Sequence, residues 1–217
     1  MSAFFCVLIG YGIGMINPSY LIARARGFDI RKSGSGNAGA SNAVITMGKG
    51  VGIFSALFDI FKAFFVTVCA GALFPETICA RELAGCACIL GHIFPAVMGF
   101  RGGKGLACLG GLILALDWRL FLILFAGEML LVFVVDYICV VPMTAAIIFP
   151  AAYAFLTRNL PGTLILSVAS VAILFRHVEN IRRIRKGTEA HLSFLWRRNK
   201  EEDRLREAAN RNSGEEK

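Results

Sequence analysis

Long apolar runs constrain the fold of this chain more than any other feature of its 217 residues. A helix that crosses a membrane needs about 20 largely apolar residues, or fewer where protein shields its ends. Seven stretches meet that requirement, and they predict an all-α polytopic membrane protein with about seven transmembrane helices. The stretches are about 3–23, 51–74, 79–99, 105–117, 119–136, 138–157 and 160–176.

The composition also favours a membrane protein over a soluble domain. Hydrophobic residues make up 56% of the chain and charged residues 18%, whereas soluble domains average about 45–50% and about 25%. Residues 176–217 differ, since they hold 12 of the 23 Lys and Arg and 8 of the 15 Asp and Glu. We therefore predict an integral membrane domain over 1–187 and a charged cytoplasmic tail over 188–217. Because its basic and acidic residues are interleaved, a membrane surface suits this tail better than nucleic acid.

The basic residues outside the apolar runs predict an orientation in the membrane. Lys and Arg gather in the loops on the cytoplasmic side. One set of alternate loops contains 19 Lys and Arg, and the opposite set contains three. The N-terminus is therefore expected outside and the C-terminus in the cytoplasm. The basic set is 24–50, 100–104, 136–138 and 176–217, and the three opposite residues are Arg81, Arg119 and Arg158.

The seven cysteines suggest neither a metal centre nor a disulfide framework. No pair has the C-x2-C spacing of a zinc knuckle, and most of the cysteines lie well inside apolar runs. Cysteine in such surroundings behaves as a small hydrophobic residue. We expect neither a metal nor a cofactor.

A glycine-rich loop over residues 31–42 is the first segment with recognisable chemistry. Its small residues allow backbone N–H groups to converge on an anion, and Ser35, Asn37, Ser41 and Asn42 add side-chain donors. This pattern predicts a phosphate site. The alternative is a flexible connection between two spans.

The second segment places a lysine among glycines. Gly91-His92-Ile93-Phe94-Pro95 is followed by Phe100-Arg101-Gly102-Gly103-Lys104-Gly105. A positive charge beside exposed backbone N–H groups stabilises negative charge that develops on an oxygen. Lys104 is expected on the same side of the membrane as the first loop. Its alternative role is that of a basic anchor at the membrane surface.

The third segment, residues 176–183, lies at the end of the last span. His177 and Asn180 are three residues apart, so a helix presents them on one face, where they can meet a bound anion. The alternative is that this segment forms a basic collar against lipid headgroups. For Arg182 and Arg183 we prefer that interpretation.

Asp59, Lys62 and Glu128 are ionisable residues that interrupt the apolar runs. Asp59 and Lys62 are three residues apart and can neutralise each other, so we interpret them as a structural pair or as support for the site. Glu128 has no evident partner near it in the sequence. Such residues are also typical of a transporter, although transporters tend to show paired, interrupted segments.

Together the three segments resemble the bacterial acyl-phosphate:glycerol-3-phosphate acyltransferase family, PlsY, over about residues 10–190. The first is similar to the family motif S-G-N-x-G-A-T-N-x-x-R, the second to G-H-x-F-P…F-K-G-G-K-G, and the third to R-H-x-x-N-I-x-R. The agreeing residues include Ser35, Gly36, Asn37, Gly39, Ala40, Asn42, Gly91, His92, Phe94, Pro95, Gly102, Gly103, Lys104, Gly105, Arg176, His177, Asn180 and Ile181.

The resemblance implies transfer of a fatty acyl group from acyl phosphate to the 1-hydroxyl of glycerol 3-phosphate, which forms lysophosphatidic acid in phospholipid synthesis. It implies catalytic roles for Lys104 and His177, while His92 orients the motif or assists proton transfer. It implies substrate and phosphate contacts for Ser35, Gly36, Asn37, Gly39, Asn42, Gly102, Gly103 and Asn180. The donor is already activated, so no protein nucleophile is required.

The resemblance also implies a place in the cell and a set of partners. A multi-pass protein of the bacterial inner or plasma membrane is expected, with its active site on the cytoplasmic face. Acyl phosphate, glycerol 3-phosphate and membrane lipids are the expected partners, together with an enzyme that supplies acyl phosphate. No nucleic acid is expected.

Two departures from the family pattern predict a weakened enzyme. Ile45 stands where the first motif ends in arginine, and Cys139 and Pro142 stand where family members usually have serines. An apolar side chain cannot replace an arginine on phosphate, although Lys49, four residues further on, is expected to supply part of the charge from one helical turn. The alternative is a catalytically silent paralogue that binds lipid phosphate or a partner.

Overall fold

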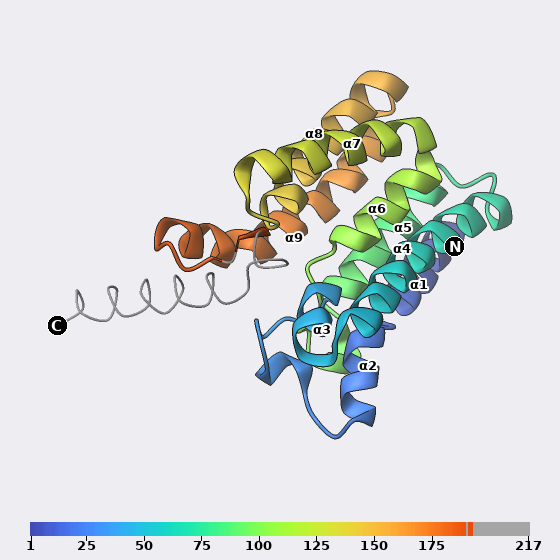
Figure 1. Ribbon diagram of the computed structural model, residues 1–217. Coiled ribbons are helices and arrows are strands. Elements are labelled where there is room, and N and C mark those ends of the chain that lie inside the picture. Colours follow the sequence, from blue (N-terminus) through green and yellow to red (C-terminus); the bar gives the residue numbers. More distant parts are fainter. Residues whose placement is uncertain (190, 193–217) are drawn as a thin grey trace.

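The computed structural model describes residues 1–189 and 191–192, and these residues fold into helices without an assigned strand. The predicted tail over 188–217 therefore lies almost entirely outside the described residues. The α-helices are α1 (Ser2–Gly14), α2 (Pro18–Ala25), α3 (Ala40–Met47), α4 (Lys49–Leu73), α5 (Ala80–Ile93), α6 (Leu106–Leu116), α7 (Trp118–Val135), α8 (Val140–Thr157) and α9 (Leu160–Arg185), with short 3-10 helices η1 (Ile30–Lys32) and η2 (Ala96–Met98) (Figure 1).

Five of these segments are long and apolar enough to cross a membrane, fewer than the seven expected. They are α4, the stretch Ala80–Met98 that begins with α5, α7, α8 and α9. The run 3–23 is broken, because Asn17 caps a new helix at Pro18 and leaves α1 and α2 bent by 40°. If this bent pair counts as one span, the number rises to six. The run 105–117 forms α6, whose 11 residues extend only about 16 Å.

Close backbone contacts hold the helices around α5, which packs on α1, α4, α6 and α9. Gly10 and Gly14 of α1 lie directly on α5, since a Cβ at either position would come within 2.3 Å of a carbonyl oxygen of Ala84 or Cys88. Small residues four apart permit this approach between membrane helices. The Gly10–Gly14 spacing is therefore used for packing.

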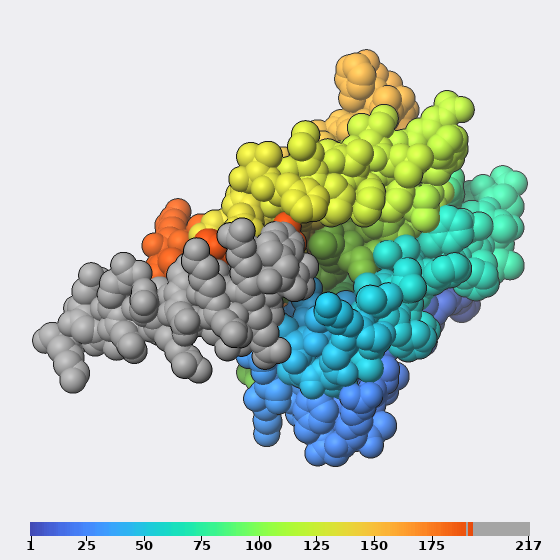
Figure 2. Space-filling view, in the orientation of Figure 1, coloured from blue at the N-terminus to red at the C-terminus, as the bar shows by residue number. Residues whose placement is uncertain are grey.

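Apolar side chains cover the outward faces of the helices as well as the core. Phe61 and Phe65 of α4 and Leu130 and Phe133 of α7 are each more than 60% exposed. Exposed apolar area on this scale is typical of a surface that faces lipid. All seven cysteines are free thiols. In the space-filling view, the surface is hollowed between α4 and the α7–α8 pair, with α6 at the floor of the hollow (Figure 2).

The segments that connect the helices meet at one end of the bundle. The amide of Asn17, between α1 and α2, donates to the Ala38 carbonyl over 2.9 Å. Arg31 donates to the carbonyl of Met98, and the backbone N–H of Leu192 donates to the Asp136 carbonyl over 2.7 Å. The three motif segments of the sequence converge in space, since Arg31 of the first contacts the second at Met98, and Lys104 of the second donates to Asn180 of the third.

Candidate active site

The glycine-rich loop is organised from within by Asn42, a buried residue in the first turn of α3. Its side-chain Nδ2 lies within 3.0 Å of the carbonyl oxygens of Ile30, Ser33 and Asn37, and its Oδ1 accepts the Ser35 N–H over 2.9 Å. Both ends of the amide are thus engaged inside the loop. These contacts favour a loop-shaping role for Asn42 over the predicted direct contact with phosphate.

The tip of the same loop presents polar groups outward. Ser35 and Gly36 are exposed, and Gly36 has a φ of +74°, in the left-handed region where glycine is favoured. Asn37 is half-buried, and its Oδ1 is buried without a hydrogen-bond partner among the described residues. Gly39 is the N-cap of α3. The loop therefore joins an exposed hydroxyl to the N-terminus of a helix, a combination that suits an anion.

Lys104 lies just before the N-cap of α6, Gly105, and reaches toward α9. Its Nζ donates to Asn180 Oδ1 over 2.5 Å, and the Nδ2 of Asn180 donates to Glu189 Oε1 over 2.6 Å. Burial lowers the pKa of the Lys104 ammonium from its usual value, although the negative charge of Glu189 opposes that shift. A partly desolvated cation of this kind interacts strongly with an oxyanion.

Gly102 and Gly103 fix the Lys104 loop against the last turn of α5. The Gly102 N–H donates to the Ile93 carbonyl over 3.1 Å, and the Gly103 N–H donates to the His92 carbonyl over 3.0 Å. A Cβ at Gly102 would lie 2.0 Å from the His92 carbonyl oxygen, so only glycine fits this approach. Their N–H groups are used inside the protein, which favours a role in placing Lys104 over direct contact with phosphate.

His177 and Asn180 lie on one buried face of α9, in the arrangement that their spacing predicted. The Nδ1 of His177 lies 2.8 Å from the Ile173 carbonyl oxygen. A neutral imidazole with its proton on Nδ1 leaves Nε2 as an acceptor. His177 is also close enough to Lys104 to be affected by its charge.

His92 occupies a different place from the other predicted catalytic residues. It is 3% exposed, its Nδ1 lies 3.3 Å from Asp59 Oδ1, and its ring lies behind the Lys104 loop. Of the two roles considered for His92, these contacts favour orientation of the motif over proton transfer.

Comparison with known proteins matches residues 4–187 to the family described as glycerol-3-phosphate acyltransferase. The chain belongs to this family. A glycerol-3-phosphate acyltransferase of Mesorhizobium japonicum is 36% identical over 187 residues, which cover 86% of this chain and 94% of the relative. That of Lactiplantibacillus plantarum is 35% identical and is covered over its full length, with 94% of this chain aligned.

Two solved structures of the family share the fold. The crystal structure of PlsY (YgiH), an integral membrane glycerol 3-phosphate acyltransferase, in its glycerol 3-phosphate form has a TM-score of 0.82 and 31% sequence identity, covering 90% of this chain and 98% of that one. The lysophosphatidic acid form has a TM-score of 0.78 and 30% identity, covering 88% and 95%. The all-helical fold of this chain is therefore that of an integral membrane acyltransferase.

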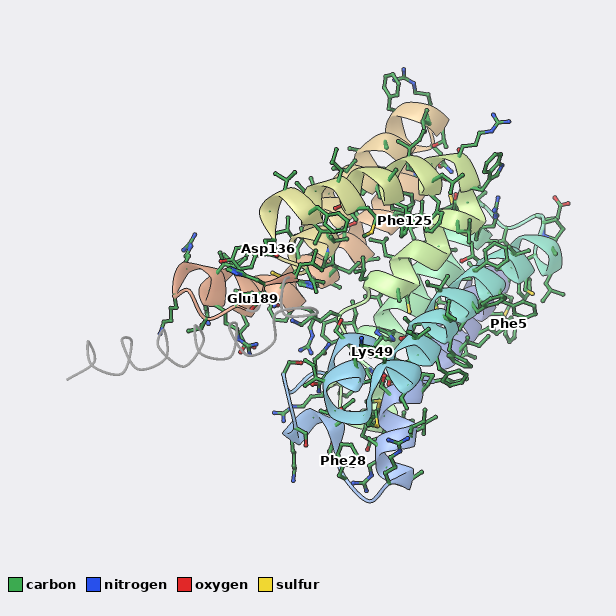
Figure 3. All side chains as sticks on the ribbon, viewed as in Figure 1. Phe5, Phe28, Lys49, Phe125, Asp136 and Glu189 are labelled. Carbon is green, nitrogen blue, oxygen red and sulfur yellow. The ribbon has the colours of Figure 1, made fainter. Side chains whose placement is uncertain are left out.

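The departures from the family motifs all lie near this site. Ile45 is 50% exposed on α3, one turn beyond Asn42. Lys49 does not lie one helical turn beyond Ile45, because Gly48, with a φ of +96°, ends α3 and starts α4 (Figure 3). The expectation that Lys49 leans back along the same helix is therefore wrong.

The second departure leaves a thiol and a proline at the start of α8. Cys139 precedes α8, and burial raises the pKa of its thiol to about 12, so it is neutral and unreactive at physiological pH. Pro142 fits the first turn of α8, where its missing N–H would have no helical partner. Neither residue offers a hydroxyl to a phosphate.

The sequence interpretation gave no role to two residues that complete the site. Glu189 lies beside the turn between α7 and α8 at Asp136 and accepts the hydrogen bond from Asn180 (Figure 3). Arg31 joins the glycine-rich loop to the Lys104 segment, because its guanidinium bonds both the Met98 carbonyl and Asp29. The hydrogen bond from Arg31 lowers the pKa of Asp29 to about 2. The spacing Asp-x-Arg at 29–31 was the available signal for this pair.

Proposed function

We propose that this chain transfers a fatty acyl group from acyl phosphate to the 1-hydroxyl of glycerol 3-phosphate. The products are lysophosphatidic acid and inorganic phosphate, and the step belongs to phospholipid synthesis. Membership of the family and the likeness to PlsY structures in glycerol 3-phosphate and lysophosphatidic acid forms support this proposal. The observation that carries it is the hydrogen bond from Lys104 to Asn180 beside a loop suited to an anion.

The proposed reaction is a direct acyl transfer. The 1-hydroxyl oxygen attacks the carbonyl carbon of acyl phosphate, and the new C–O bond forms as the carbonyl oxygen becomes negatively charged. The bond from carbon to the phosphate oxygen then breaks, and phosphate leaves with the electron pair. We assign the hydroxyl proton to Nε2 of His177, from which it passes to phosphate. Because the donor is a mixed anhydride, correct placement and charge stabilisation are sufficient.

Each motif segment takes one part in this proposal. Lys104 stabilises the developing negative charge, and Asn180 holds the ammonium in place. Ser35, Gly36, Asn37 and the N-cap of α3 at Gly39 receive a phosphate. The acyl chain lies in the hollow between α4 and the α7–α8 pair (Figure 2).

We further propose the bacterial inner or plasma membrane as the location, with the site on its cytoplasmic face. When the α1–α2 pair and α6 each count as one crossing, alternate loops hold 19 against three Lys and Arg, which supports an outside N-terminus and a cytoplasmic C-terminus. An enzyme that makes acyl phosphate is the corresponding partner. Labelling of single cysteines in a cysteine-free variant tests the orientation: position 33 should react from the cytoplasm and position 76 from outside. Reaction of 33 from outside would place the site on the other face.

The decisive experiment is an assay of the purified protein in detergent with long-chain acyl phosphate and glycerol 3-phosphate. Phosphate release and lysophosphatidic acid are measured together, and equal amounts of both are expected. Ile45 gives a specific reason to consider the silent paralogue. If wild type, Ile45→Arg and Ile45→Arg/Pro142→Ser release no phosphate above a no-enzyme control, the paralogue replaces the enzyme.

A further inference from the structure

A charged cluster lies inside the bundle, away from the proposed substrates. Asp59 and Lys62 lie one turn apart on α4, and His92 reaches them from the last turn of α5. The Lys62 Nζ is 2.7 Å from Asp59 Oδ1 and 3.2 Å from His92 Nδ1, and Asp59 Oδ1 is 3.3 Å from His92 Nδ1. All three side chains are less than 5% exposed. We refer to these three residues as the Asp59–Lys62–His92 cluster.

The Lys62 side chain connects this cluster to the glycine-rich loop. Its Nζ donates to the Gly14 carbonyl over 3.0 Å and to the Ile16 carbonyl over 2.6 Å, where α1 gives way to α2. The next residue, Asn17, donates from its amide to the Ala38 carbonyl over 2.9 Å. The position of the loop that contains Ser35 and Asn37 thus depends on where Lys62 holds the chain.

The His92 residue connects the same cluster to the Lys104 loop. Its backbone carbonyl accepts the Gly103 N–H over 3.0 Å. Its ring lies so close to Gly103 that a Cβ there would come within 2.0 Å of Nε2. Lys104 is the next residue in the chain, so a shift of the imidazole moves the proposed catalytic ammonium.

The same neighbourhood resembles a metal site, because ligand atoms of Asp59, His92 and Cys108 lie within 4.8 Å of one another. The Lys62 ammonium, however, already occupies the place of a cation there. Its Nζ hydrogen-bonds the carbonyls of Gly14 and Ile16, lies 3.2 Å from His92 Nδ1, and forms an ion pair with Asp59 Oδ1 over 2.7 Å. The contacts therefore describe a closed ion-pair network.

We infer that the Asp59–Lys62–His92 cluster positions the two reacting loops relative to each other. Burial of charges among apolar helices is costly, and an apolar pair of similar size would pack α4 on α5 without that cost. What the charged pair adds is a link from one point on α4 to both loops. The inference rests on the proposed function, in which glycerol 3-phosphate at one loop must meet acyl phosphate beside Lys104. These residues are positioning residues, since none of them is placed against substrate.

The first test measures catalysis in Asp59→Asn and Lys62→Met, with Thr67→Val as the matched control. Thr67 is a fully buried polar residue on the same helix, and within residues 1–189 and 191–192 its hydroxyl bonds only the Ala63 carbonyl of its own helix. Misplacement of reacting groups by about 1 Å can lower a rate about a hundredfold. We expect lysophosphatidic acid formation to fall about ten- to a hundredfold in both cluster variants. Phosphate release should exceed lysophosphatidic acid, because water takes the acyl group when the hydroxyl is misaligned.

The second test measures the distance between the loops without reference to activity. Spin labels at Ser41→Cys and Arg101→Cys, in a background with the seven native cysteines replaced by alanine, report on the two loops from exposed positions. A narrow distance distribution is expected with the intact cluster, and a broad one with Asp59→Asn. Thermal melting in detergent identifies any variant that fails to fold. If a single variant fails to fold, the double variant Asp59→Asn/Lys62→Met, which removes both charges, replaces it in these measurements.

Unchanged distance distributions together with wild-type turnover in the cluster variants would overturn the inference. Equal loss of folded protein, with normal turnover and equal product ratios in the folded fraction, would also overturn it. If the wild-type protein makes no lysophosphatidic acid while the distance distribution still broadens, the proposed function fails and the positioning of the loops by the cluster stands.

Discussion

Helix α5 carries a buried polar cluster at each of its ends, and the two clusters differ in what they contact. At its start, Glu82 accepts a hydrogen bond from the Tyr153 hydroxyl, and the Asn159 amide lies 3.4 Å from the same carboxylate oxygen. His92, ten residues later and about 15 Å away, belongs to the cluster with Asp59 and Lys62.

The first cluster joins helices to helices. Tyr153 belongs to α8, and Asn159 is the N-cap of α9, where it accepts the Gly162 N–H over 3.0 Å. Among the contacts of the described residues, those of Glu82, Tyr153 and Asn159 stay at this end of the bundle. The Asp59–Lys62–His92 cluster instead reaches the backbone that leads into two loops. The two clusters contain similar groups with similar burial. Their expected roles differ because they contact different backbone segments.

The largest expected effect is at Lys104, where the second cluster meets the proposed chemistry. Lys104→Ala should lower turnover about a hundredfold or more, as does loss of one oxyanion donor. Lys104→Arg should restore little, because a planar guanidinium differs in shape from an ammonium. Initial rates of lysophosphatidic acid formation measure both. Arg26→Ala, which removes an exposed charge at the end of α2, is the control. Full activity in Lys104→Ala would make this lysine a membrane anchor only.

A smaller effect is expected from Ile45→Arg beside the glycine-rich loop, and it is a gain in affinity for glycerol 3-phosphate. One charge-assisted hydrogen bond contributes about 1.5–3 kcal/mol, which corresponds to roughly ten- to a hundredfold in affinity. The exposed position on α3 leaves room for a longer side chain. The KM for glycerol 3-phosphate should therefore fall by about tenfold. Ile45→Met, which is apolar and of similar length, should leave the KM unchanged, and an equal fall in both variants would contradict a phosphate contact.

The pH dependence of turnover should distinguish Lys104 from the exposed basic residues. Burial lowers the pKa of Lys104 below the ordinary value of 10.5, so its charge is lost at a lower pH than that of an exposed lysine. Since the cation is required, turnover should fall on the alkaline side before pH 10.5 is reached. The residual activity of Lys104→Arg should lack this decline, because a guanidinium stays protonated. The same alkaline decline in both proteins would assign it to another group.

The smallest effect on turnover is expected at the opposite end of α5. Glu82→Gln weakens buried hydrogen bonds to Tyr153 and Asn159, so it should lower the free energy of unfolding by about 1–3 kcal/mol. Turnover and KM of the folded protein should stay within about twofold of wild type, since none of these groups contacts the loops. Thermal melting and the lysophosphatidic acid assay are run on the same samples as Asp59→Asn. A hundredfold loss of turnover in Glu82→Gln would remove the distinction between the two clusters.

The sequence predicted what depends on neighbours along the chain. Apolar runs identified α4, α5, α7, α8 and α9, and motif spacing placed His177 and Asn180 on one helix face. The run 3–23 looked continuous because its composition stays apolar across Asn17 and Pro18, although these two residues start a new helix. The shortness of α6 was visible only as a cluster of glycines.

Contacts between distant segments could not be predicted in this way. Thr144, sixteen residues after Glu128, supplies the partner that the sequence did not reveal. The acceptors for Lys62 at Gly14 and Ile16 lie at the end of α1 and in the segment that follows it. The positive φ of Gly48 separates Ile45 from Lys49, although their spacing fits one helical turn. Each of these depends on tertiary packing or on one backbone angle.

The end of α1 shows why a charge from α4 is needed at that point. A helix C-terminus carries a partial negative charge from its unpaired carbonyl groups, and helices commonly place a basic residue in their own last turn. The last turn of α1 has none, and the Lys62 ammonium takes that place from a different helix. Where water is scarce, a backbone can leave helical geometry only if its carbonyls find other donors. The direction that α2 takes is therefore determined by the electrostatic compensation of the α1 dipole as well as by Pro18.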